Sequence, residues 1–228
     1  MSGGRADGRT GGLCLIVAAL SAGPTVRPSV QDPGPILDRA SAAYATVRTL
    51  SADFVQVVVN PLVGGPDTTR GRLYQMRPNH FAMRFSDPRG DRIVADGRYF
   101  WVYTPSTTPG QVIRAGIPDA GPTGPNLIGQ FVEAPRERYR ARYLRADSLA
   151  TGWADVVALA RRADDGSPPW TEAVIWVDRH DGLLRRIEIV ETSGQRRFIA
   201  LRNLKVNAGV PTGEITFSPP AGVRVVDQ

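Results

Sequence analysis

Side chains able to act as a catalytic base or to bind a metal ion are scarce in this sequence. The chain of 228 residues has two histidines, His80 and His180, and one cysteine, Cys14. His180 precedes Asp181, and a histidine oriented by a carboxylate can activate a serine in a secreted hydrolase, but no pattern marks the serine. We expect His180 to lie in a solvated turn and His80 to face water from a strand. The sequence therefore predicts no catalytic residue and no metal site.

Patterns for binding cofactors and nucleic acids are also missing from the sequence. There is no P-loop, and no Rossmann glycine pattern leads into a helix. The net charge is +6, and Lys205 is the only lysine among the basic residues. A basic balance favours attraction to anionic membranes or acidic partners. We therefore expect no cofactor and no nucleic-acid partner.

Four arginines recur at every second position: Arg136, Arg138, Arg140 and Arg142. On a strand they would point to one side of the sheet. Such a stripe could dock an acidic transporter surface or anionic lipid, or it could lie on a solvated convex face. We favour the solvated face, because runs of charge are usually solvated.

The first 22 residues have the features of a secretory signal peptide. Arg5 and Arg9 supply a charged start, residues 13–20 form a short apolar run, and small residues follow at 21–23. Cys14 lies inside the apolar run, where it is not placed for lipid anchoring. Prolines make residues 23–35 an extended linker. We therefore expect export to the periplasm and a single domain over residues 36–228.

An amphipathic helix is predicted after the linker, followed by strands. Pro35 suits a first helical position, and apolar residues then recur at helical spacing up to Leu50. Beyond Leu50 the apolar period changes to two, which indicates strands. They are predicted at 51–60, 70–76, 81–85, 92–95, 99–103, 139–145, 155–161, 170–178, 183–191, 197–206 and 214–218. Residues 104–125 are rich in proline and glycine and are predicted to be irregular, and a short apolar helix is predicted at 126–132.

These elements predict a mainly β fold of the α+β kind. Sequential hairpins give an antiparallel meander, and a sheet of roughly ten strands must curl. Its inner face needs a cover, and the two helices are the candidates. We therefore expect a strongly curved sheet, an unclosed antiparallel β-barrel, with a helical lid.

The alternation in the strands puts a set of large apolar side chains on the predicted inner face. They could line a lipid-binding cavity or form an ordinary core, and from the pattern alone we favour a core. Met83 would suit a cavity because a thioether adapts to flexible chains. The set comprises Phe54, Leu73, Phe81, Met83, Phe85, Trp101, Tyr103, Ile175, Ile187, Ile189 and Phe217.

Four segments, in order along residues 36–228, resemble the LolA family of periplasmic lipoprotein carriers. Each segment is a weak signal alone, whereas four in order behind a signal peptide are fairly specific. Residues 104–125 and 147–170 depart from the family pattern. The four are Phe54-x-Gln56 after the helix, Arg77-Pro78-Asn79-His80-Phe81, Asp96-Gly97 followed by Trp101-x-Tyr103-x-Pro105, and Phe217-Ser218-Pro219-Pro220-x-Gly222-Val223.

The resemblance implies an unclosed barrel with a helical lid and a chaperone without enzymatic activity. Such a carrier takes acylated lipoproteins from an ATP-driven (ABC-type) inner-membrane transporter and passes them to an outer-membrane acceptor lipoprotein. Acyl chains need a carrier to cross the aqueous periplasm, because each methylene exposed to water costs about 0.8 kcal/mol. We expect a monomer.

The resemblance also gives Arg77 a role in closing the lid. Family members have an arginine before this proline that hydrogen-bonds to the lid, and the lid here would include Leu127, Ile128 and Phe131. Alternatively, Arg77 is a surface arginine that ends a strand before Pro78. Two rival functions stay open: a LolA-like domain that binds another lipid or glycolipid or senses envelope stress, and a hydrolase that uses His180.

Overall fold

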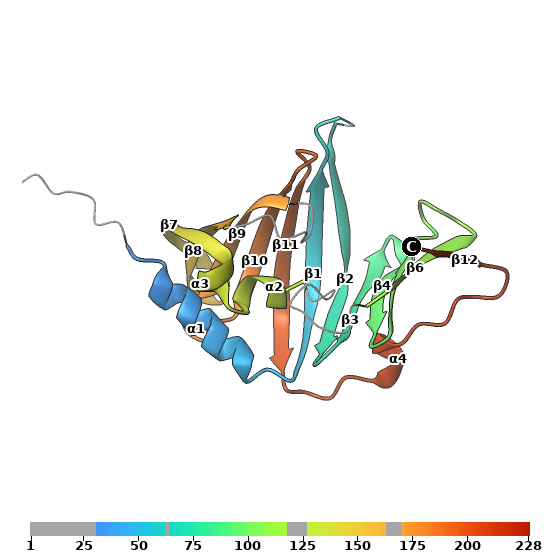
Figure 1. Ribbon diagram of the computed structural model, residues 1–228, viewed down its shortest axis with the longest axis horizontal. Coiled ribbons are helices and arrows are strands. Elements are labelled where there is room, and N and C mark those ends of the chain that lie inside the picture. The colour runs from blue at the N-terminus through green and yellow to red at the C-terminus, as the bar shows by residue number, and fades with distance from the viewer. Residues whose placement is uncertain (1–30, 63, 118–126, 163–169) are drawn as a thin grey trace, which may run out of the picture. The chain divides into compact units, whose positions relative to one another are not determined.

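In the computed structural model, which describes residues 31–62, 64–117, 127–162 and 170–228, one long antiparallel sheet dominates the fold (Figure 1). The predicted signal peptide and residues 23–30 of the predicted linker lie outside the described residues. The strands of the first half are β1 (Thr49–Val59), β2 (Pro66–Met76), β3 (His80–Asp87), β4 (Arg89–Asp96), β5 (Tyr99–Tyr103) and β6 (Gln111–Gly116). Those of the second half are β7 (Tyr139–Leu149), β8 (Gly152–Arg161), β9 (Trp170–Asp178), β10 (Leu184–Glu191), β11 (Arg196–Val206) and β12 (Arg224–Asp227).

The twelve strands form one unclosed, curved sheet, which confirms the predicted fold class. Their order is β12-β6-β5-β4-β3-β2-β1-β11-β10-β9-β8-β7. All neighbours are antiparallel except β12, which pairs parallel to β6. β1 and β11 pair at the centre, although Leu201 lies 147 positions after its partner Phe54 along the chain. The meander of the first half is therefore joined to that of the second through one long-range pairing.

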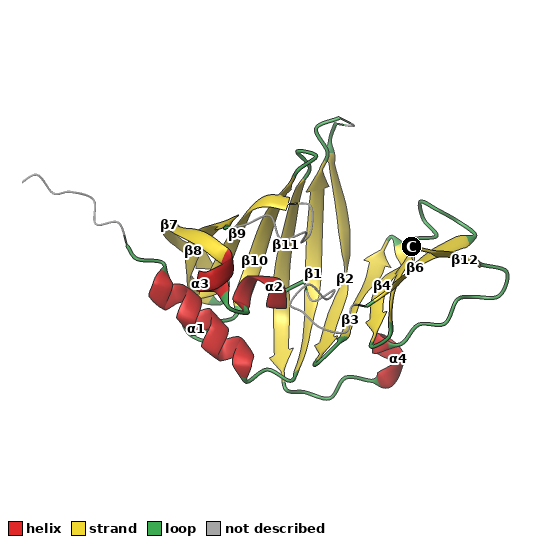
Figure 2. Cartoon of the chain, viewed as in Figure 1, coloured by secondary structure: helices red, strands yellow, loops and turns green. Residues whose placement is uncertain are grey.

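Four short or medium helices occur among the described residues: α1 (Gly34–Ala45), α2 (Gly129–Val132), α3 (Pro135–Arg138) and α4 (Thr212–Ile215). α1 begins one residue before the predicted position, so that Pro35 lies in its first turn. It ends at Ala45, earlier than the helical spacing predicted, and Leu50 belongs to β1. Figure 2 shows α1, α2 and α3 beside one another, whereas α4 lies next to β3 and β4. In the described part of the chain, no helix is both long and apolar enough to cross a membrane.

Two predicted segments differ from the structure. Residues 214–218 are not a strand, because α4 ends at Ile215 and the chain then runs without ladder pairing until β12. Ile215 and Phe217 are buried because they pack on the sheet. The alternation of apolar and polar residues at 214–218 therefore reflects this contact and not strand pairing. Residues 111–116, within the segment predicted to be irregular, form β6 because β5 and β12 pair with them on either side.

The two faces of the sheet carry separate apolar clusters. In β3, Phe81 and Met83 belong to one cluster and Ala82 between them belongs to the other. We call the face with Phe81 and Met83 the inner face, because Ile36, Leu37 and Tyr44 of α1 and Phe131 of α2 pack in the same cluster. The opposite, outer face carries the cluster around Trp101 and a smaller one around Val156 and Trp176. Successive side chains in a strand point to opposite faces, so each strand contributes to both.

Candidate functional site

The inner face brings together eight of the eleven apolar residues predicted to line a cavity. Seven of them are buried, at most 7% exposed, and Ile187 pairs directly with Ile175 across β9 and β10. Phe85 is half-buried at the edge of the cluster. The eight are Phe54, Leu73, Phe81, Met83, Phe85, Ile175, Ile187 and Ile189.

Gly71 makes room for the aromatic part of this face. It pairs with Phe54 on one side and Phe85 on the other, and those two rings pack edge to face with centroids 5.2 Å apart. A Cβ at Gly71 would lie 2.0 Å from the Arg84 carbonyl oxygen and 2.9 Å from the Phe54 ring. The glycine is therefore required by close approach and not by a turn.

The structure corrects the prediction for Trp101, Tyr103 and Phe217, which lie on the outer face. Trp101 pairs with Val94, and Val94 pairs with Ala82, so all three share the face opposite Phe81. Phe217 packs on them from the C-terminal segment, with ring centroids 5.4 Å from Trp101 and 5.7 Å from Tyr103. These three side chains belong to the outer cluster and cannot contact a ligand held under α1.

α1 and α2 cover the inner cluster as the predicted lid. Ile36, Leu37 and Ala40 of α1 are at most 3% exposed. Phe131 of α2 packs against Trp170, with ring centroids 5.6 Å apart. Leu127 and Ile128 precede α2, which is shorter than the predicted helix, but both pack on the same cluster.

Arg77 contacts α1 and lies near the end of α2. Its Nη2 donates to the Tyr44 carbonyl oxygen at 3.1 Å, in the last turn of α1. The same Nη2 lies 3.7 Å from Glu133 Oε1, at the end of α2. Arg77 therefore holds one helix-end carbonyl and one carboxylate, and its side chain stays 39% exposed.

A second polar contact holds α1, and sequence reasoning missed it. Arg39 Nη2 of α1 donates to Asp155 Oδ2 at 2.8 Å, and Arg179 donates to Asp155 Oδ1 through both Nε and Nη2. Burial raises the pKa of the Asp155 carboxyl, but hydrogen bonds from Arg179 and Arg39 lower the pKa by more, so it lies below its ordinary value. An aspartate in an otherwise apolar stretch of β8 was the available signal.

Two glutamines put polar groups among the apolar side chains of the inner face. Gln56 is 7% exposed, donates to Thr69 and accepts from Arg197. Gln75 is 4% exposed, and its Oε1 is buried without a hydrogen-bond partner. Because a buried polar atom without a partner is costly, the Gln75 Oε1 lowers the stability of this face.

The two histidines lie apart from this face. His180 is exposed in the turn between β9 and β10, where its backbone N–H donates to Asp178. His80 is half-buried rather than facing water, because its ring packs against Gly97 and its Nδ1 is buried without a partner. In the described ranges, no three histidine, cysteine or acidic side chains gather as metal ligands would.

The predicted arginine stripe does not form. Arg136 and Arg138 belong to α3, where Arg136 pairs with Asp38 of α1 and Arg138 donates to the Gln130 carbonyl oxygen. Arg140 and Arg142 are exposed on β7. Pro135 starts a turn of helix, which breaks the strand period before residue 139.

Sequence comparison assigns the chain to a family. The sequence model described as outer membrane lipoprotein carrier protein LolA matches residues 45–218. The chain belongs to the LolA family. This LolA-family chain is 30% identical over 189 residues to an outer-membrane lipoprotein carrier protein of Albidiferax ferrireducens, which covers 80% of the chain and 86% of that protein. A protein of the same name from Chromobacterium violaceum is 27% identical over 179 residues, covering 78% of the chain and 81% of that protein.

Solved structures share the fold of this LolA-family chain. An uncharacterised conserved protein from Thermus thermophilus superposes with a TM-score of 0.53 at 12% identity, covering 87% of the chain and all of that protein. The crystal structure of MucB superposes with a TM-score of 0.50 at 16% identity, covering 86% of the chain and 65% of MucB. At these identities the likeness concerns the fold alone.

Proposed function

We propose that this protein is a periplasmic chaperone that binds the acyl chains of lipoproteins on its inner face and carries them from the inner to the outer membrane. The carrier-like role follows from membership of the LolA family and from relatives named as lipoprotein carriers. The observation that supports the site is a continuous apolar inner face under a lid held by replaceable polar contacts. No catalytic side chain is needed for this role.

One end of the inner face supports the binding of acyl chains. Phe85, Ile93, Phe100 and Ile117 pack on the inner cluster but are only half-buried. Apolar side chains that remain partly accessible beside a packed cluster are suited to holding a flexible alkyl chain, since contact with it removes further apolar area from water. The β3–β5 end is therefore where we expect an acyl chain to make its first contacts.

The lid must move before an acyl chain can reach the inner-face residues beneath it. Ile175 and Ile187 are at most 1% exposed beneath the lid. An acyl chain can contact them when α1 or α2 shifts away, and the polar contacts of Arg77 and Arg39 permit this because water can replace them. Cargo then substitutes its own apolar surface for that of the helices.

The proposal includes partners on both membranes. An inner-membrane ABC-type transporter would load the carrier, and an outer-membrane acceptor lipoprotein would unload it. The signal peptide at residues 1–22 would deliver the chain to the periplasm. The basic net charge of +6 fits transient contacts with acidic surfaces.

Native mass spectrometry of the protein purified from its own periplasm tests the carrier role. We expect a fraction of the molecules to carry a diacylated or triacylated lipoprotein. If another lipid or glycolipid occupies the protein instead, the LolA-like fold serves a different cargo or a sensing role.

A generic esterase assay tests the enzymatic alternative separately. We expect no turnover, and His180→Ala should leave the background unchanged. Activity that disappears in His180→Ala would overturn the carrier proposal.

A further inference from the structure

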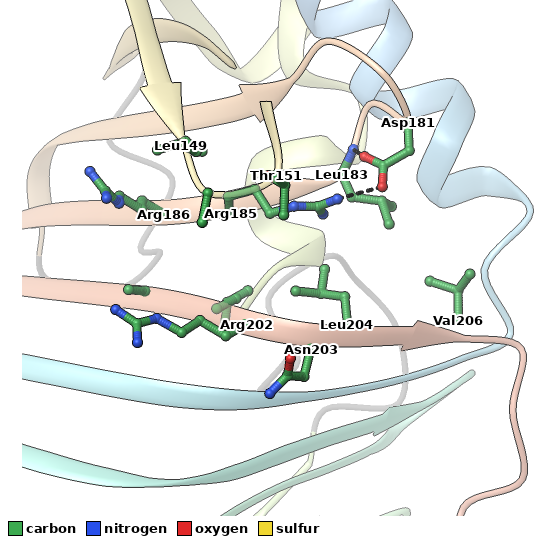
Figure 3. A pocket seen from close by; sticks show the side chains of 13 residues that line it. Leu149, Thr151, Asp181, Leu183, Arg185, Arg186, Arg202, Asn203, Leu204 and Val206 are labelled. Atoms are coloured by element: carbon green, nitrogen blue, oxygen red, sulfur yellow. Dashed lines mark hydrogen bonds and ion pairs between the residues drawn. The ribbon is translucent and has the colours of Figure 1, made fainter. Parts of the chain in front are cut away.

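The sheet opens between β10 and β11. The two strands pair from Arg186 with Ala200 to Val190 with Arg196 and no further. β11 continues to Val206, which pairs with Leu50 of β1 on its other side. The stretch of β11 from Leu201 to Val206 therefore has no ladder partner towards β10, and Figure 3 shows the two strands diverging.

A pocket of about 640 Å³ occupies this opening, a volume typical of small-ligand sites. Figure 3 shows Leu204 facing the gap from β11, and Leu149 at the end of β7 also lines the pocket. Leu183 and Leu201 line the pocket and also belong to the inner cluster, so the opening reaches the inner face. Aliphatic side chains share its lining with polar and charged ones, among them Asp181, Arg185 and Arg202.

Arg185 places an unused hydrogen-bond donor in this pocket. Its side chain is 11% exposed, Nη2 pairs with Asp181 Oδ2, and Nε lies 3.2 Å from Asp178 Oδ2 without hydrogen-bond geometry. Its Nη1 is buried and has no hydrogen-bond partner. A guanidinium donor left unpaired next to aliphatic side chains favours a ligand that brings an oxygen acceptor together with an apolar chain.

We propose that the opening between β10 and β11 binds a long acyl chain, with its carbonyl or carboxylate oxygen accepting a hydrogen bond from Arg185 Nη1. The inference extends the proposed carrier function to a second acyl site, distinct from the space under the lid. From Arg185 and the neighbouring Leu183, the acyl chain would extend along Leu201 and Leu204 towards Val206.

The lining favours an acyl chain over a peptide strand. A peptide strand that paired with β11 would need pockets for every second one of its side chains. The pocket instead offers leucine and valine side chains together with the unpartnered Nε and Nη1 donors of one arginine, Arg185. One polar end and one apolar body match a fatty acyl group.

Photo-crosslinking with two probes tests this site. The first probe is palmitic acid with a diazirine near its methyl end, and the second is a diacylated lipopeptide with the same diazirine. We expect crosslinks within residues 149–151 and 201–206, mapped by mass spectrometry on the unsubstituted protein. Crosslinks by one probe only would identify the source of the acyl chain as free fatty acid or as lipoprotein.

A matched pair of variants checks the assignment. Leu204→Arg puts a charge into the pocket and should weaken crosslinking there about tenfold. Leu62→Arg makes the same change at a residue that is 89% exposed in the loop between β1 and β2, and should leave the crosslinks unchanged. Equal crosslinking at 149–151 and 201–206 in both variants would overturn the site.

The failure of this inference is distinguishable from failure of the carrier function. Crosslinks confined to α1, α2 and the inner strands would refute the second site and leave the carrier role intact. No crosslink with either probe anywhere on the chain would refute both.

Discussion

Two arginine contacts set how firmly α1 is held against the sheet. Arg77 reaches the Tyr44 carbonyl in the last turn of the helix, and Arg39 reaches Asp155 from its middle. Both arginine side chains are more than a third exposed, at 39% and 37%. Solvent can therefore compete for each contact, and we infer that the lid is stabilised without being locked.

Replacing Arg77 should loosen the lid and disturb cargo release. Arg77→Leu removes the hydrogen bond to Tyr44 and should lower the free energy of unfolding by about 1 kcal/mol. We expect faster hydrogen exchange in α1, with lipid still bound but poorly transferred to an acceptor. Arg48→Leu is the control, because the exposed Arg48 side chain makes no ion pair or hydrogen bond within the described ranges. Normal transfer by Arg77→Leu would contradict the lid role.

Asp155 should make the attachment of α1 sensitive to acid. Its pKa is lowered in the folded protein, so its contribution to stability is complete above its unfolded pKa and is lost as pH falls through the lower folded value. Asp155→Asn should reduce the free energy of unfolding by about 1–3 kcal/mol at neutral pH. This is less than the usual cost of breaking a buried ion pair, because water can hydrate the Arg39 and Arg179 side chains that lose their partner. Urea denaturation at a series of pH values measures this.

The pH dependence separates a charge effect from a packing effect. The stability difference between the unsubstituted protein and Asp155→Asn should narrow as pH falls below about 4. A gap that stayed constant down to strongly acidic pH would mean that the Asp155 charge does not hold α1.

At the scale of elements, the sheet separates the face on which we propose that cargo binds from a face that serves folding. The inner face meets α1 and α2, while the outer face of β2–β6 is covered by α4 and the segment that follows it. Arg84 fixes α4 by donating from Nε to the Glu214 carbonyl oxygen at 2.9 Å and pairing with its carboxylate at 2.6 Å. Because the clusters lie on opposite faces, changes to each should have separate effects.

Phe217→Ala tests this separation. Phe217 is 9% exposed in the outer cluster, so its loss should cost about 3 kcal/mol of stability and leave acyl-chain affinity unchanged. Phe81→Ala, in the inner cluster, should lower both stability and affinity. Thermal denaturation and a lipid-binding titration measure the two quantities. Weaker lipid binding by folded Phe217→Ala would show that the outer cluster takes part in the site.

At the scale of the whole described unit, an unclosed sheet leaves two edge strands, β7 and β12. Exposed edges can pair with other molecules unless charges oppose this. β7 carries the exposed Arg140, Arg142 and Arg145, and β12 carries Arg224 and Asp227. The charges on both edges favour a monomer.

Removing the charge from one edge should promote association. We expect the unsubstituted protein to sediment as a monomer, and the double variant Arg140→Val with Arg142→Val to show concentration-dependent oligomers. Arg98→Val, at an exposed residue in the turn between β4 and β5, should stay monomeric. A dimer of the unsubstituted protein at micromolar concentration would contradict this account of the edges.

Local patterns predicted most of the elements and pointed to residues of the proposed site. Period-two alternation gave β5 and β9 their bounds, and helical spacing from Ile36 to Tyr44 gave α1 its buried side. The motif before Pro78 pointed to Arg77, whose contact with Tyr44 the structure shows. These signals are local, because a helix or strand that buries one face repeats its apolar residues at a fixed spacing within its own sequence.

Period and composition alone determined that the chain is a half-buried sheet with a short apolar lid, because each strand and helix must bury one side. Only the tertiary structure decided that Trp101 and Phe217 face away from Phe81, that Asp155 meets Arg39, and that β10 parts from β11. The reason is register: with a side-chain period of two, a shift of one residue moves a strand's whole apolar set to the other face. Register and long-range contact depend on how strands far apart in the sequence pair, and no single segment contains that information.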